Sequence, residues 1–84
     1  MRNEVLHVTP TDDFELVLVY GNGEHRRFDV KPLLSLKPWT RIATPNVFKL
    51  ARVAYGTVVW LGNVDIAPET LWLDSQPGQS AEVP

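Results

Sequence analysis

The sequence predicts a small α+β domain in which two antiparallel β-hairpins form one small sheet with two short helices. Apolar segments that are followed by glycine-containing turns predict the hairpins. Two Asp–x–x–Pro sequences, which are typical of helix starts, predict the helices. The chain has 84 residues, 44% of them hydrophobic and 21% charged, which is the composition of one globular domain. We therefore expect residues 1–73 to form a single domain.

The first hairpin has the strongest strand signal in the chain. Residues 4–9 alternate and end at a proline, which predicts a strand. Residues 14–20, FELVLVY, are apolar on both faces, which predicts a central strand that is covered on both sides. Gly21-Asn22-Gly23 tolerates the positive φ angles of a tight turn. Residues 24–28, EHRRF, are therefore expected to return antiparallel to 14–20.

The connection between the hairpins is predicted to be helical in part. Asp29 precedes Pro32 by three residues, which predicts a short helix over 30–36 with Asp29 as its cap. Pro45-Asn46-Val47-Phe48 is compatible with one further helical turn that places Phe48 in the core.

The C-terminal half repeats these signals. Residues 49–55 and 57–61 flank Gly56 and predict the second hairpin. Asp65 and Pro68 predict a second helix over 66–72, with Asp65 as its cap. Residues 74–84 are rich in Ser, Gln, Pro and Gly, and we expect them to form a disordered tail.

Composition excludes several classes of protein. Cysteine is absent, which excludes disulfides and thiolate metal sites and favours a cytoplasmic location. No apolar segment is long enough to cross a membrane, and the N-terminus does not resemble a secretory signal. We therefore expect a cytoplasmic protein that is not membrane-bound.

No motif for catalysis or cofactor binding is present. His7 and His25 are the only imidazoles, and their spacing does not suit a metal site. Gly21 and Gly23 lack the third glycine of a dinucleotide-binding loop, and the P-loop sequence is absent. We therefore expect no catalytic residues, no cofactor, no metal and no enzymatic activity.

The charges are unevenly distributed along the chain, although the net charge is −2. Segment 26–52 contains seven basic residues against Asp29 alone: Arg26, Arg27, Lys31, Lys37, Arg41, Lys49 and Arg52. One interpretation is that these residues pair with acidic residues of neighbouring strands. The other is a basic face that binds an acidic partner or a nucleic acid.

Trp39 lies between two prolines in a predicted loop, and we consider it a candidate anchor for a protein partner. Arg41, Arg26 and Arg27 are the accompanying candidate partner-binding residues. The alternative for Trp39 is a place in the core or at its edge.

The residues that form these turns also resemble a known family. Tyr20-Gly21-Asn22-Gly23-Glu24, Arg27-Phe28-Asp29-Val30, Gly56-Thr57-Val58-Val59-Trp60 and Asp65-Ile66-Ala67-Pro68-Glu69 are similar to segments of a bacterial family known as domain of unknown function 2442. The similarity covers about residues 4–73, and the chain departs from the family at Val64, where members often have glycine. The resemblance implies a small α+β fold and no known enzymatic activity.

The resemblance also suggests a function. Some family members precede a helix-turn-helix domain, which this sequence does not contain, and others resemble one half of a toxin–antitoxin pair. We therefore expect a non-catalytic protein-interaction module, the antitoxin-like half of a pair with a neighbour-encoded protein. The alternative is a nucleic-acid-associated regulatory accessory protein that uses segment 26–52. The small core leaves two states open, a homodimer and a monomer whose connection 36–48 covers the exposed sheet face.

Overall fold

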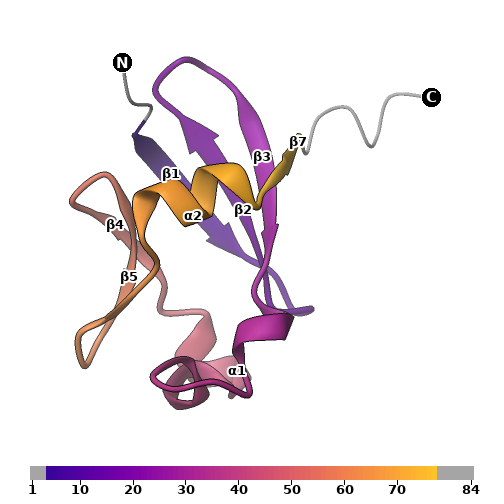
Figure 1. The fold of residues 1–84 in the computed structure, drawn as a ribbon, viewed down its shortest axis with the longest axis vertical. Helices are drawn as coiled ribbons and strands as arrows, with labels where there is room; N and C mark the ends of the chain where they lie inside the picture. The colour runs from indigo at the N-terminus through magenta and orange to yellow at the C-terminus, as the bar shows by residue number, and fades with distance from the viewer. Residues whose placement is uncertain (1–3, 78–84) are drawn as a thin grey trace.

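Two antiparallel sheets form the framework of the protein, whose computed structural model describes residues 4–77 (Figure 1). The four-stranded sheet has the order β1-β2-β3-β7. Its strands are β1 (Val5–Pro10), β2 (Glu15–Tyr20), β3 (His25–Asp29) and β7 (Gln76–Pro77). The three-stranded sheet has the order β4-β5-β6 and contains β4 (Arg52–Ala54), β5 (Thr57–Trp60) and β6 (Val64–Asp65). The predicted α+β class is therefore confirmed.

Short helical turns connect and cover the sheets. Between β3 and β4 the chain forms two 3₁₀ turns and one α-helical turn, η1 (Lys31–Leu33), η2 (Trp39–Ile42) and α1 (Pro45–Phe48). The helix α2 (Pro68–Leu73) follows β6 and crosses one face of the four-stranded sheet (Figure 1). None of the helices between residues 4 and 77 has the length and hydropathy that a membrane span requires.

The prediction of one sheet is wrong, although both predicted hairpins are present as β2–β3 and β4–β5. The three helical turns of segment 30–51 separate the hairpins, so that their strands do not join one ladder. The sheets still meet, because the backbone N–H of Val5 donates to the carbonyl of Gly56 at 3.2 Å. Each hairpin also gains a further strand, β1 beside β2 and β6 beside β5.

β2 lies between β1 and β3 in the four-stranded sheet, and only one of its faces is buried. Leu16, Leu18 and Tyr20 point into the core and are at most 1% exposed. Val17 and Val19 alternate with them and are half-buried on the other face. The expectation that both faces are covered is therefore wrong, because α2 packs on the face of Tyr20 and no described helix packs on the face of the two valines.

The first predicted helix is shorter than expected. Segment 30–36 forms only the 3₁₀ turn η1, because Leu34 is already its C-cap and the N–H of Leu36 turns back to the carbonyl of Leu33. The second helix begins at Pro68 rather than at residue 66, because the N–H of Ile66 donates to the carbonyl of Val58 on β5 at 3.3 Å and Ala67 is the N-cap. The expected turn at Pro45–Phe48 is present and places Phe48 in the core.

The core lies between the two sheets and the helical connection. Trp60 of β5 is its largest side chain, 2% exposed, and its indole N–H donates to the carbonyl of Phe48 at 2.9 Å. Phe48 also contacts the ring of Phe14 edge-on, with 5.0 Å between centroids. Aromatic rings from three separate segments therefore hold the helical turn α1 against the second sheet.

Residues 74–77 are part of the fold, whereas the sequence predicted a disordered tail over 74–84. Ser75 is buried, and Gln76 and Pro77 pair with Arg27 and Arg26 of β3. Two paired residues are too few to give a strand periodicity in the sequence, which explains the difference. Residues 78–84, the remainder of the predicted tail, lie outside the described residues.

Candidate functional site

The outer face of the three-stranded sheet carries a groove of about 350 Å³, which we call the outer groove. It is lined by Arg52, Tyr55, Val59, Trp60, Leu61, Gly62, Asn63, Val64 and Asp65. β5 alternates between the two faces of its sheet, so that Val58 and Trp60 point into the core while Thr57 and Val59 lie on the other face. All three strands of the sheet therefore contribute to the groove.

Two opposite charges flank the apolar centre of the outer groove. Val59 lies directly opposite Arg52 on β4 and directly opposite Asp65 on β6. Residues that are directly opposite on neighbouring strands share a face, so Arg52, Val59 and Asp65 form one row across the sheet. Both charged residues are exposed, and neither side chain has an ion pair with any residue between 4 and 77.

Large apolar side chains stand at the turns at the two ends of the groove. Tyr55, in the turn between β4 and β5, is 93% exposed, and Leu61, in the turn between β5 and β6, is 69% exposed. Tyr55 has a φ of 56° and is followed by Gly56 with a φ of 74°. This left-handed pair of residues directs the tyrosine ring away from the core.

Trp39 and Arg41 support the far turn of the groove. The indole N–H of Trp39 donates to the backbone carbonyl of Asp65 at 3.1 Å, and Nη1 of Arg41 donates to the carbonyl of Gly62 at 3.3 Å. Trp39 is half-buried and packs against the core, so its body is at the core edge while its N–H holds β6. These two candidate partner-binding residues are therefore bonded to residues that line the outer groove, and neither lines it itself.

Arg26 lies in a different region, beneath the C-terminal segment. Its guanidinium donates to the carbonyl of Ser75 at 2.7 Å and to the Ser75 hydroxyl, and forms an ion pair with Glu24 at 2.6 Å. The same group lies 4.3 Å from the centroid of Trp72, a cation–π distance. With a side chain only 13% exposed, Arg26 anchors residues 72–77 to β3.

Arg26→Ala is expected to lower the free energy of unfolding by about 2–3 kcal/mol, because it removes charge-assisted hydrogen bonds and leaves the Ser75 carbonyl without its donor. Urea denaturation followed by circular dichroism measures this loss. Arg26→Lys keeps the charge without the planar fork, and we expect an intermediate loss. A midpoint unchanged by the alanine substitution would contradict the anchoring role.

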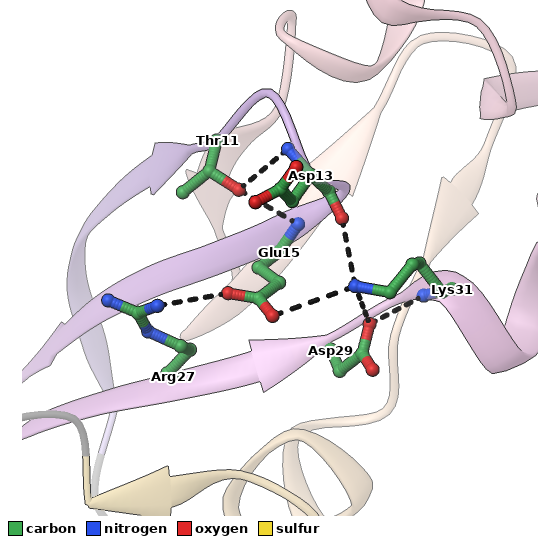
Figure 2. Close-up of polar contacts among 6 residues, drawn as sticks. All are labelled: Thr11, Asp13, Glu15, Arg27, Asp29 and Lys31. Carbon is green, nitrogen blue, oxygen red and sulfur yellow. Dashed lines mark hydrogen bonds and ion pairs between the residues drawn. The ribbon is translucent and has the colours of Figure 1, made fainter. Parts of the chain in front are cut away.

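Arg27 and Lys31 form a charge network toward the other end of β3 (Figure 2). Arg27 pairs with Glu15 at 3.1 Å, and Nζ of Lys31 lies 3.1 Å from Asp29 and 3.6 Å from Glu15. Nζ of Lys31 also donates to the carbonyl of Asp13. The hydrogen bond with Asp29 raises the pKa of Lys31 above its usual value. Arg27 and Lys31 are therefore paired with acidic residues of their own hairpin, as the first of the two interpretations expects.

Asp29 and Asp65 were predicted to be helix caps, and the structure corrects both assignments. The carboxylate of Asp29 accepts the backbone N–H of Lys31 at 3.0 Å, but the N-cap of η1 is Val30. The N-cap of α2 is Ala67, without a side-chain hydrogen bond. Asp65 lies too early for capping, because the extended Ile66 separates it from the helix.

The histidines do not form a site with other ligands. His7 and His25 both lie opposite Val19, on β1 and β3, and both are exposed. Within residues 4–77 no three His, Cys, Asp or Glu side chains come together as a metal-binding group. His7 and His25 therefore lie on the same face of the four-stranded sheet, on either side of Val19.

The outer groove could not be predicted from the sequence, because it depends on the register of two strand pairs. Arg52, Val59 and Asp65 are separated in sequence, and only the pairing of three strands places them in one row. The alternation of side chains along β5 places Val59 on the face opposite Trp60. This alternation does not indicate which residues of β4 and β6 lie beside Val59.

The chain belongs to the family described as "Protein of unknown function (DUF2442)", whose model matches residues 5–76. The match extends from the first residue of β1 to the first residue of β7, so it includes every residue of the outer groove. No curated protein and no solved structure matches the chain.

Proposed function

We propose that this member of the DUF2442 family is a non-catalytic protein-interaction module that binds its partner through the outer groove. The observation that carries the proposal is the row Arg52–Val59–Asp65, in which an apolar centre is flanked by opposite charges. Protein interfaces combine an apolar centre with polar residues at the rim. The outer face of the three-stranded sheet has the same arrangement, with Val59 at its centre and the two charged residues at its sides.

The exposed aromatic and aliphatic side chains at the groove support the proposal. Tyr55 and Leu61 expose most of their apolar surface to solvent, and tyrosine is among the residues that contribute most to interface energies. Arg41 bonds to the turn that carries Leu61, and Trp39 bonds to β6 directly after that turn. A supported surface loses less conformational freedom on binding than a mobile one.

The charge pairs support a protein partner over a nucleic acid. Arg26, Arg27 and Lys31, three of the seven basic residues in segment 26–52, are paired with carboxylates of this chain. Their charge is therefore less available to phosphate groups, which supply most of the affinity for nucleic acids. Steep salt dependence of binding to a nucleic acid would reverse this preference.

The proposed partner is a small protein encoded beside this chain, as in antitoxin-like pairs, and we place the complex in the cytoplasm. The surface that fits the outer groove has an apolar side chain between one acidic and one basic side chain. Such a surface would pair with Asp65 and Arg52 and cover Val59.

Co-expression with the neighbour-encoded protein and isothermal titration calorimetry test this proposal. Leu61→Ser and Tyr55→Asn are expected to weaken binding at least about 10-fold, because they remove exposed apolar contacts. Asparagine suits the positive φ of Tyr55, so that variant changes the side chain without straining the turn.

Leu73→Ser is the matched control, because Leu73 is 74% exposed but lies on α2, away from the groove. It is expected to bind as the unaltered chain does. Equal affinities for all three variants would reject the outer groove as the binding surface.

A further inference from the structure

The outer groove requires a partner surface that this same chain presents. Its complement is an apolar centre with a carboxylate on one side and a guanidinium on the other. Asp65, Val59 and Arg52 are such a surface. A face that is its own complement is suited to an isologous contact, in which two copies use the same patch.

We infer that a second copy of this chain occupies the outer groove, giving a homodimer in which the two three-stranded sheets pack face to face. This inference rests on the proposed function, because it uses the same surface; the second copy and the neighbour-encoded protein would therefore compete for the outer groove. A twofold axis that lies between the two sheets, parallel to β5, brings β4 of one copy over β6 of the other. Each Arg52 then faces the Asp65 of the opposite copy, and the two Val59 residues, each 9% exposed, lie nearest to the axis.

The charge pattern selects this orientation over its alternative. An axis perpendicular to β5 in the same plane would place Arg52 over Arg52 and Asp65 over Asp65, and like charges in contact oppose association. With the parallel axis, both ion pairs form together. The axis also brings the two Tyr55 rings to one end of the interface and the two Leu61 side chains to the other, which covers the most exposed apolar groups of the groove.

The small size of the face sets the expected strength. A sheet of three short strands provides less than the roughly 800 Å² per partner of a standard stable interface. We therefore expect a dimer with a dissociation constant in the micromolar range, about 1–100 μM. Light scattering with size-exclusion chromatography, over concentrations from about 1 μM to 1 mM, should show the mass rise from 9.5 kDa toward twice that value.

Charge reversal tests the orientation. Arg52→Glu places a glutamate opposite Asp65, and Asp65→Arg places an arginine opposite Arg52, so each variant alone is expected to remain at 9.5 kDa. Both positions are exposed, and the fold of each variant is checked by circular dichroism. A mixture of the two variants in equal amounts is expected to form a heterodimer. In that heterodimer the introduced glutamate of one chain faces the introduced arginine of the other, and the native Arg52–Asp65 pair forms at the second site.

The chain carrying both changes, R52E/D65R, is expected to recover the homodimer with the charges exchanged. A constant mass of 9.5 kDa for the unaltered chain up to about 1 mM overturns the inference. Dimers that persist in both single variants, or single variants that do not associate when mixed, overturn the proposed face and axis.

These outcomes are separate from those of the proposed function. If the unaltered chain stays monomeric but Leu61→Ser and Tyr55→Asn lose the neighbour-encoded protein, the homodimer is wrong and the interaction module stands. If the charge-reversed pair associates but no neighbour-encoded protein binds, the outer groove is an interface between copies and the antitoxin-like pairing is wrong.

Discussion

Replacing Trp60 by alanine is expected to remove about 4–8 kcal/mol from the free energy of unfolding, which is most or all of the stability of a chain of this length. A buried tryptophan that is truncated to alanine costs about 3–5 kcal/mol, and the loss of the indole donor leaves the Phe48 carbonyl unpaired at a further cost of about 1–3 kcal/mol. The total stability of a chain of this length is about 4–13 kcal/mol. Circular dichroism in the absence of denaturant should show that the β signal of Trp60→Ala is lost or that its urea midpoint falls sharply.

Trp60→Phe is the matched control, because it retains most of the volume and removes the hydrogen bond with Phe48. We expect it to fold and to be less stable than the unaltered chain by about 1–3 kcal/mol. A Trp60→Ala variant with nearly unchanged stability would show that the packing between β5 and α1 does not hold the core together.

Alkaline pH is expected to destabilise the protein through Tyr20. Burial raises the pKa of Tyr20 from its usual 10.0 to about 12, because the tyrosinate would lose its hydration in the core. Above pH 10 the unfolded chain loses this proton while the folded chain still holds it, so the unfolded state is favoured. The contribution of protonated Tyr20 to the free energy of unfolding is fully present below about pH 10. It is lost as the pH rises to about 12, so the free energy of unfolding falls by about 2–3 kcal/mol over this range.

Tyr20→Phe should remove this decline. The Tyr20 hydroxyl is buried and has no hydrogen-bond partner among the residues that the structure describes, so phenylalanine should be tolerated at neutral pH. Urea denaturation between about pH 8 and pH 12 compares the two proteins, with Tyr55→Phe as the control at an exposed ring. If Tyr20→Phe keeps the full decline, other groups cause it.

Turns could be predicted from the sequence because their chemistry is local. Gly23 and Gly56 adopt the positive φ angles that their turns require, and both hairpins form around them. The division into two sheets could not be predicted in this way. Whether β4 joins the ladder of β1 depends on the path of segment 30–51, which no short-range signal specifies.

The charged residues show the same limit. The compensation of Arg27 by Glu15 follows from adjacent strands of one hairpin, and it agrees with the first of the two interpretations of the basic segment. The row Arg52–Val59–Asp65 needs the register of two strand pairs at once, and a slip of one residue in either pair would move a charge to the opposite face. Asp65 was consequently interpreted from its spacing to Pro68 rather than from its neighbours on β5.

The prolines at the borders of the four-stranded sheet affect how the protein can associate in a crowded cell. β1 ends at Pro10 on one border, and β7 ends at Pro77 on the other. Proline lacks the N–H that a neighbouring chain would need to extend the ladder, so each border offers one donor fewer for strand addition. Growth of the sheet from molecule to molecule, the route to fibrils, is thereby disfavoured at both borders.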